Sequence, residues 1–201
     1  MQGLRVKTVT TKTEEWDQPI IRQNEIGYLG FITKKINGVL HFLTQAKIEP
    51  GNIGGIQLSP TLQATKSNCL RLHRGKKPLY LEYFQNATKD NIITDTLQSE
   101  IGSRFIKKRN RNIIINVNEE IPVKDGFKWM TLKDLKKLMS FDNIVNMDTR
   151  SVLSNIRFNG KSIDENLFNQ CSKENSYIIN SLFGVGKAIN NIEEILNYIT
   201  Y

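Results

Sequence analysis

The chain has 201 residues, of which 39% are hydrophobic and 24% are charged, and 28 Lys and Arg residues against 20 Asp and Glu residues give a net charge of +8 at pH 7. This composition is typical of a water-soluble globular protein long enough for one sizeable domain and an appendage. It argues against a membrane protein, because no run approaches the roughly 18 apolar residues that a membrane-spanning helix needs.

The cysteines and histidines give little support to a metal or redox centre. Cys69 and Cys171 are far apart and match no metal-binding or redox spacing. The sequence has only two histidines and shows no secretory leader pattern. We therefore expect a reduced, cytoplasmic protein that binds no metal ion.

The excess of positive charge has two interpretations. It suits a protein that binds nucleic acid, and it equally suits an enzyme whose substrate carries phosphates. Basic residues alternate with acidic ones over most of the chain, and the densest basic run is confined to residues 107–111. Because no nucleic-acid-binding signature accompanies this run, we expect a solvated surface or a phosphate-binding enzyme rather than a nucleic-acid-binding protein.

Extended segments dominate the first half of the chain. Residues 1–13 alternate weakly and indicate a short strand. Asn37 and Gly38 separate two β-rich segments, 26–36 and 39–48, and predict a β-hairpin. After a turn-rich loop the segment 56–64 alternates again, but its Pro60 indicates an edge strand or an irregular one.

The second half changes from strand to helix. Residues 79–84 suit a strand or a short helix, and residues 90–104 carry amides and acids at mixed spacing. Residues 105–117 indicate a strand, and we expect a loop over 119–130. Thr131 precedes a helical spacing of leucines and, with Asp134, predicts a capped helix. Further helices are predicted over 145–156 and, beyond a polar linker, over 178–201. Strands followed by helices indicate an α+β fold with a mixed sheet.

Five segments in this order resemble one family. They are WDQPIIRQNEIGYLGF, GVLHFLTQAKIEPGN, QLSPTLQATKSN, YLEYF and DGFKWMTL. Together they are similar to the NDP-hexose 2,3-dehydratases of deoxysugar biosynthesis. The resemblance implies a Nudix-like domain over residues 1–157 that lacks the Nudix hydrolase box, followed by a helical tail over 158–201 that resembles the connector between two domain copies.

The resemblance also implies an activity. Family members remove water across C2 and C3 of a dTDP-4-keto-6-deoxyhexose without a cofactor, usually with two tandem domain copies and as dimers. This chain carries one copy, so we expect a homodimer that catalyses this reaction. The alternative is a non-catalytic nucleotide-sugar-binding half-protein of the same family.

The reaction requires a base for the C3 proton, a positive group at the C4 oxygen and an acid for the C2 hydroxyl. On the strand 39–48, alternate side chains share one face, which brings Gln45, Lys47 and Glu49 together after His41. Glu49 is the candidate base, and Lys47 is the candidate partner of the C4 oxygen or a phosphate. Gln45 and His41 would orient hydroxyl groups. The competing interpretation is the solvated outer face of a sheet.

The remaining candidates come from neighbouring motifs. His73 is the candidate proton donor, and Arg71 and Arg74 are the candidate diphosphate ligands. Glu82 and Glu100 compete with Glu49 for the role of base. Arg104 is a further candidate for binding phosphate. The other candidate substrate-binding residues, each of which also has a purely structural interpretation, are Gln57, Ser59, Thr61, Gln63 and Asn68 for polar contacts and Trp16, Tyr80 and Tyr83 for stacking on thymine.

Overall fold

The structure, a computed structural model, describes residues 1–7, 15–71 and 75–156. The strands are β1 (Gln2–Lys7), β2 (Glu15–Ile20), β3 (Gly27–Ile36), β4 (Val39–Ile48), β5 (Ile56–Ser59), β6 (Leu62–Ala64), β7 (Ile92–Ser99), β8 (Arg109–Val117) and β9 (Phe127–Thr131). The helices are α1 (Lys66–Cys69), α2 (Leu81–Gln85), α3 (Leu132–Leu138) and α4 (Met147–Leu153). The helix predicted over 178–201 lies outside the described residues, and the division at residue 157 stays a prediction.

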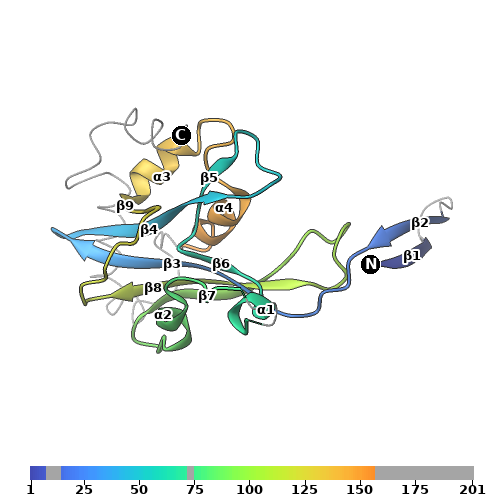
Figure 1. The fold of residues 1–201 in the computed structure, drawn as a ribbon, viewed down its shortest axis with the longest axis horizontal. Helices are drawn as coiled ribbons and strands as arrows, with labels where there is room; N and C mark the ends of the chain where they lie inside the picture. Colours follow the sequence, from blue (N-terminus) through green and yellow to red (C-terminus); the bar gives the residue numbers. More distant parts are fainter. Residues whose placement is uncertain (8–14, 72–74, 157–201) are drawn as a thin grey trace, which may run out of the picture.

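Seven of these strands form one mixed sheet, which confirms the predicted α+β class (Figure 1). Its order is β5-β4-β3-β8-β7, with β6 also paired to β3 and β9 to β4. The β3–β8 pair is parallel, whereas the other pairs in the sheet are antiparallel. Strands β1 and β2 form a separate antiparallel ribbon at the right-hand end of Figure 1.

The predicted hairpin joins β3 to β4. Asn37 and Gly38 have φ angles of 50° and 78°, which is the left-handed backbone that a two-residue hairpin turn requires. The two strands pair only next to this turn, over residues 33–36 and 39–42. Farther from the turn each strand has other partners, and this separation opens the sheet.

The segment from β5 to β6 closes one side of that opening. Strand β5 pairs with β4, and after only Pro60 and Thr61 the chain continues as β6, which pairs with β3. The Thr61 hydroxyl donates to the Leu43 carbonyl and accepts from the Ile32 amide, so it ties β4 to β3 at the crossing point. The irregularity that Pro60 predicted is thus the place where the chain changes partner strand.

Each face of the sheet carries its own apolar core. On one face, Phe31, Phe42 and Ile114 pack with the leucines of α3 and α4. On the other face, Ile113 packs with Leu81 and Phe84 of α2. Figure 1 shows α3 and α4 on the side of the sheet opposite to α1 and α2.

Local capping fixes where the two longer helices begin. Thr131 and Asp134 form the predicted capping box of α3, in which each side chain accepts a hydrogen bond from the backbone N–H of the other residue. Asn146 caps α4 through its side-chain oxygen, which accepts from the Thr149 amide at 2.8 Å. Both predicted helices, over 131–139 and 145–156, are confirmed within a few residues.

One sequence expectation is wrong, and one further strand lies where no element was predicted. The segment 90–104 contains β7, and the segment 119–130, expected as a loop, contains most of β9. Both strands are held by long-range pairing, β7 to β8 and β9 to β4. Tertiary contacts outweigh weak local preferences in such strands.

Candidate active site

A polar cluster occupies the opening between β4 and β6. The Lys47 ammonium lies 3.3 Å from the Glu49 carboxylate and 3.4 Å from the Gln63 backbone carbonyl oxygen. The Gln63 side-chain amide donates to the same Glu49 oxygen at 3.1 Å. Lys47 and Glu49 therefore lie together, as the alternation of β4 predicted, and one cation and one amide contact the carboxylate.

The first turn of α4 joins this cluster. The Asn146 side-chain amide donates to the Gln63 side-chain oxygen at 2.9 Å, and the Asn146 backbone N–H donates to the Leu58 carbonyl at 3.0 Å. Gln63 is thus held at both ends, by Asn146 and by Glu49. We call Lys47, Glu49, Gln63, Asn146 and Asp148 the α4 cluster.

The sequence predicted neither Asn146 nor Asp148 as a site residue, and Asp148 is the charged one of the two. It is half-buried, and its side chain accepts no hydrogen bond from the described residues. Burial, reinforced by the negative charges of Glu100 and Glu49 and opposed by the positive charge of Lys47, raises the pKa of Asp148 to about 6. Its position in the first turn of a helix is ordinary for an aspartate, so the sequence carried no signal of this environment.

The layer between α4 and the sheet is also polar. The Ser151 hydroxyl donates to Gln98 at 2.6 Å, and the Asn155 oxygen accepts from Gln98 and Thr96 at 2.9 Å. Beside them the Asn110 amide donates to Glu100 at 2.7 Å. The α4 cluster therefore continues as a band of amides and hydroxyls along β7 and β8.

Within this band, one buried acceptor has no partner among the described residues. The Asn112 side chain is 1% exposed, and its carbonyl oxygen accepts no hydrogen bond there. By strand alternation Asn112 shares the α4-facing side of β8 with Asn110 and Ile114. Most buried polar atoms in proteins are hydrogen-bonded, so this oxygen stands out as an acceptor open to a donor from outside the described residues.

The other polar candidates on β4 and β5 do not reach Glu49. Gln45 accepts a long hydrogen bond, 3.5 Å, from Ser59, and Gln57 donates to the Asn143 carbonyl at 3.0 Å. Thr61 is 2% exposed and bonded to backbone, as described above. His41 is buried, with its Nδ1 2.9 Å from the Val39 carbonyl oxygen, and so contacts its own strand.

The candidates around α1 and the loop after β7, most of them basic, lie at the surface. Asn68 and Arg71 are exposed, and the Arg71 guanidinium donates to the Gly75 carbonyl at 3.3 Å. Arg104 is exposed in the loop after β7. His73 and Arg74 lie outside the described residues, so their roles stay predictions.

The aromatic candidates are dispersed. Tyr80 is 5% exposed, its hydroxyl donates to the Pro122 carbonyl at 2.9 Å, and its ring lies edge-on against Phe127. Tyr83 packs beside Tyr80. Trp16 is 44% exposed on the separate ribbon, where it donates to Gln18.

The rival carboxylates lie on opposite sides of the sheet. Glu82 belongs to α2 and forms an exposed ion pair with Lys77 at 3.3 Å. Glu100 lies close enough to the α4 cluster for its negative charge to contribute to the raised pKa of Asp148. Of the two rivals for the role of base, only Glu100 therefore belongs to the surroundings of Lys47 and Glu49.

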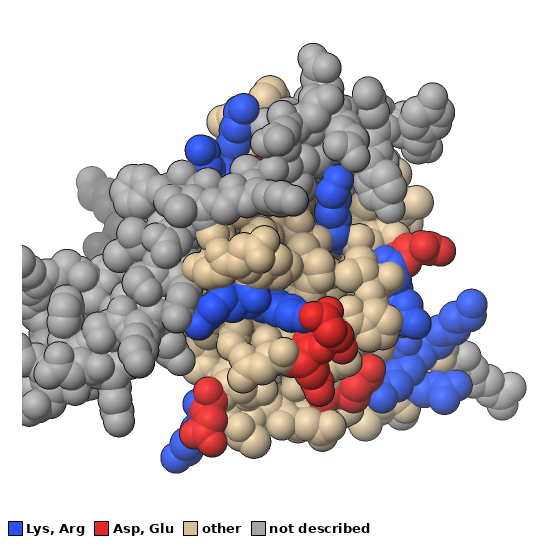
Figure 2. All heavy atoms as spheres, turned by 90° about the vertical axis from the view of Figure 1, so that its left-hand side faces the viewer, with Lys and Arg blue, Asp and Glu red and all other residues tan. Residues whose placement is uncertain are grey.

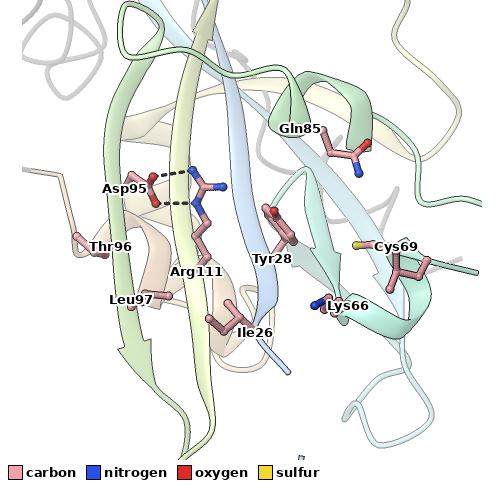
Figure 3. A pocket seen from close by; sticks show the side chains of 10 residues that line it. Ile26, Tyr28, Lys66, Cys69, Gln85, Asp95, Thr96, Leu97 and Arg111 are labelled. Atoms are coloured by element: carbon pink, nitrogen blue, oxygen red, sulfur yellow. Dashed lines mark hydrogen bonds and ion pairs between the residues drawn. The ribbon is translucent and has the colours of Figure 1, made fainter. Parts of the chain in front are cut away.

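The α1–α2 face of the sheet holds a separate cavity of about 620 Å³ (Figure 3). Figure 3 shows Arg111 and Asp95 joined by two hydrogen bonds, of 2.8 and 2.6 Å, across β8 and β7. The guanidinium carbon lies 5.6 Å from the centre of the Tyr28 ring, and the bond to Asp95 raises the pKa of Arg111. Lys66 of α1 and Gln85 of α2 complete the wall, and we call this site the Arg111 cavity.

Charges of both signs are mixed on the surface at the tip of the β3–β4 hairpin. Figure 2 shows Lys and Arg side chains next to Asp and Glu side chains there, without an uninterrupted basic surface. One such pair joins Lys34 to Glu120. This face therefore resembles the solvated surface expected from the alternating charges.

Two other classes of site find no support in the described part of the chain. No group of three or more His, Cys, Asp or Glu side chains there is arranged to hold a metal ion. None of the described helices is long and apolar enough to cross a membrane.

Among solved structures, the chain is similar to the Ap4A hydrolase of C. elegans, with 16% sequence identity and a TM-score of 0.38 over 66% of this chain and 96% of that one. The C-terminal domain of mouse MUTYH gives the same TM-score with 12% identity, over 66% of this chain and 86% of that one. A TM-score this low does not establish a shared fold, so the Nudix-like description stays a prediction.

Curated relatives are much more similar. A dTDP-4-dehydro-6-deoxy-alpha-D-glucopyranose 2,3-dehydratase of Saccharopolyspora spinosa is 51% identical over 79% of this chain and 32% of its own length. An enzyme of the same name from Streptomyces violaceoruber is 46% identical over 78% of this chain and 35% of its own length. The chain thus spans about a third of these relatives. Since a sequence model of NDP-hexose 2,3-dehydratases matches residues 1–156, the chain belongs to that family.

Proposed function

We propose that the chain is a lyase that removes water across C2 and C3 of a dTDP-4-keto-6-deoxyhexose, acting as a homodimer in the cytoplasm. The observation that carries this proposal is the Lys47–Glu49 pair, because it combines a candidate base with a cation in a protein of the 2,3-dehydratase family. The names of the relatives supply the substrate class.

The geometry of the pair suits the first half of the reaction. The C4 carbonyl acidifies the C3 proton, and a carboxylate at Glu49 would accept it. Negative charge then develops on the C4 oxygen, where the Lys47 ammonium, 3.3 Å from Glu49, would stabilise it. Gln63 and Asn146 hold the pair in place through two further hydrogen bonds.

Substitutions at these two positions test the assignment. Glu49→Gln keeps the size of the side chain and the bond from Gln63 but removes the base, and we expect turnover to fall about 100- to 10,000-fold. A melting temperature close to that of the parent chain would confirm that the fold is intact. Parent-like turnover in both Glu49→Gln and Lys47→Ala would overturn the assignment.

The second candidate function is nucleotide-sugar binding without catalysis. The Arg111 cavity favours it, because its volume of about 620 Å³ is typical of small-molecule sites and its wall combines an aromatic ring with two cations. Incubation with the dTDP-linked keto sugar separates the two functions: a dTDP-dependent rise in melting temperature without loss of substrate supports binding alone.

A further inference from the structure

The Lys47–Glu49 pair leaves half of the proposed reaction without a group to perform it. Removal of the C3 proton and stabilisation of the enolate account for Glu49 and Lys47. The C2 hydroxyl is a poor leaving group unless it receives a proton as the C–O bond breaks. Neither Lys47, which contacts two acceptors, nor Glu49, which takes up a proton in the same reaction, is suited to supply it.

We propose that Asp148 is the acid that protonates the departing C2 hydroxyl, within the α4 cluster that also contains Glu49. This inference rests on the proposed dehydratase function and adds a residue to its chemistry. Asp148 lies two positions after Asn146, whose side chain is bonded through Gln63 to Glu49. The first turn of α4 therefore holds the Asp148 carboxyl at the edge of the opening that contains the candidate base.

The hydrogen-bonding state of Asp148 fits a donor. Glu49 contacts a lysine and an amide, Glu100 accepts from Asn110, and Asp95 accepts from Arg111, whereas Asp148 accepts no hydrogen bond from the described residues. A carboxyl that is partly buried without donors is better suited to the neutral, protonated form. Its raised pKa, about 6, agrees with this geometry.

Asn112 provides a second indication that a ligand occupies this region. Its buried carbonyl oxygen, on the same α4-facing side of the sheet, lacks a donor among the described residues. Around it lie the amides and hydroxyls of β7, β8 and α4, including Gln98 and Ser151. Carboxyl and amide oxygens accept hydrogen bonds from the hydroxyl groups of a sugar, and Asp148 and Asn112 both lack a donor among the described residues.

The proposed step balances in atoms and charge. Glu49 takes the C3 proton, and the electron pair of the C3–H bond forms the enolate of the C4 ketone. Collapse of the enolate restores the C4 carbonyl and forms the C2–C3 double bond, while the C2–O bond breaks and the oxygen leaves as water with the proton from Asp148. Glu49 ends protonated and Asp148 ends ionised, and exchange with solvent returns both to their starting states.

An analogue with fluorine in place of the C2 hydroxyl tests the proposal, because fluoride leaves without a proton. For Asp148→Asn we expect water release from the normal substrate to fall about 100- to 10,000-fold, with fluoride release from the analogue within about threefold of the parent chain. Glu49→Gln should lose both reactions. Asp142→Asn, which changes an exposed aspartate just before α4, should lose neither.

The dependence on pH gives an independent readout. In the parent chain, water release should decline as the pH rises above about 6, because Asp148 then loses the proton that it donates; Glu49, Glu100 and Lys47 are the charged groups that act on it. Fluoride release should lack this decline. His73, the sequence-based candidate for the same role, predicts instead that His73→Gln removes the decline.

Three results would overturn the proposal, and they differ from one another. Parent-like water release by Asp148→Asn would show that another group is the acid, with the dehydratase function intact. Equal losses of water and fluoride release would show that Asp148 only supports the structure. A parent chain that releases neither water nor fluoride would overturn the proposed function itself, and the role of Asp148 with it.

Discussion

The α4 cluster and the Arg111 cavity lie on opposite faces of one sheet and differ in how their polar groups are satisfied. In the Arg111 cavity, the strongest charges neutralise each other, since both hydrogen bonds of the pair run between Arg111 and Asp95. In the α4 cluster, the Asp148 carboxyl has no donor among the described residues, and the buried Asn112 oxygen on the same face of the sheet has none either. The Arg111 cavity therefore offers space for a ligand, whereas the α4 cluster offers groups that can transfer protons.

This difference separates two properties that often coincide in enzymes. A large, mostly apolar hollow is the usual mark of a binding site, whereas a carboxyl with a strongly shifted pKa beside a charged pair marks a site of proton transfer. Here the hollow and the shifted carboxyl are on different faces, with the β3–β8 pair between them. We therefore expect substitutions on the two faces to have different effects, which four predictions test.

The largest expected effect is on the chemistry of the α4 cluster. Lys47→Met keeps most of the apolar length of the side chain but removes the charge beside Glu49. Loss of one group that stabilises an oxyanion costs about 100- to 1,000-fold in turnover, equivalent to roughly 3–4 kcal/mol. Steady-state kinetics with the keto sugar should show this loss. Lys77→Met, which removes an exposed lysine paired with Glu82, is the control and should retain parent turnover.

The next effect is on stability, and its sign follows from the raised pKa of Asp148. A carboxyl whose pKa is about 6 in the folded chain and lower in the unfolded chain binds more protons when folded, so stability falls as the pH rises through this range. Asp148→Asn removes the buried charge and should stabilise the chain at pH 7 by up to roughly 3 kcal/mol. Urea unfolding at pH 4 and pH 7 measures the effect.

At pH 4 the gain from Asp148→Asn should nearly vanish, because the parent carboxyl is then protonated in the folded chain. Equal stabilisation at both pH values would show that the amide improves packing or hydrogen bonding instead. That result would contradict the raised pKa of Asp148. The α4 cluster and the Arg111 cavity would then no longer differ by a carboxyl with a shifted pKa.

These contrasts also show what the sequence was able to predict. The β3–β4 turn depends on Asn37 and Gly38 alone, and the start of α3 depends on Thr131 and Asp134, so local chemistry was sufficient for both. Strands β7 and β9 depend on partners far along the chain, and turn-rich residues conceal β9. Local patterns therefore predicted the fold class but not the full sheet.

The same distinction applies to the candidate site. Alternation along β4 was enough to bring Lys47 and Glu49 together, since both belong to one extended segment. Gln63 was predicted as part of a polar stripe, but its bond to Glu49 depends on the change of partner strand at Pro60. Asp148 joins them only because α4 packs across the opening, which no local pattern encodes.

A smaller effect is expected on the α1–α2 face, where Gly30 lies against α2. A methyl group at Gly30 would lie 2.3 Å from the Phe84 ring, which is buried and cannot move freely. Gly30→Ala should therefore destabilise the chain by about 1–3 kcal/mol, the usual cost of overpacking a core. Gly3→Ala has open space around its new methyl group and is the control.

Calorimetry and kinetics together make the Gly30→Ala prediction specific to one face. Because Phe84 belongs to α2, the strain should fall on the wall of the Arg111 cavity, and the hydrogen bonds of the α4 cluster should stay intact. Turnover per folded molecule should remain within about threefold of the parent chain. A larger loss of turnover would show that the two faces are coupled through the sheet.

The smallest effect on stability is expected inside the Arg111 cavity. A substitution there tests whether the cavity binds the nucleotide. Leu97 is half-exposed on its wall, so Leu97→Trp should change stability by less than about 0.5 kcal/mol while filling part of the space. If the cavity holds the nucleotide, the rise in melting temperature caused by dTDP should largely disappear, whereas Ile53→Trp, in an exposed loop, should retain it. If Leu97→Trp retains the full dTDP response, the nucleotide binds elsewhere, and the α4 face must then accommodate both the sugar and its diphosphate.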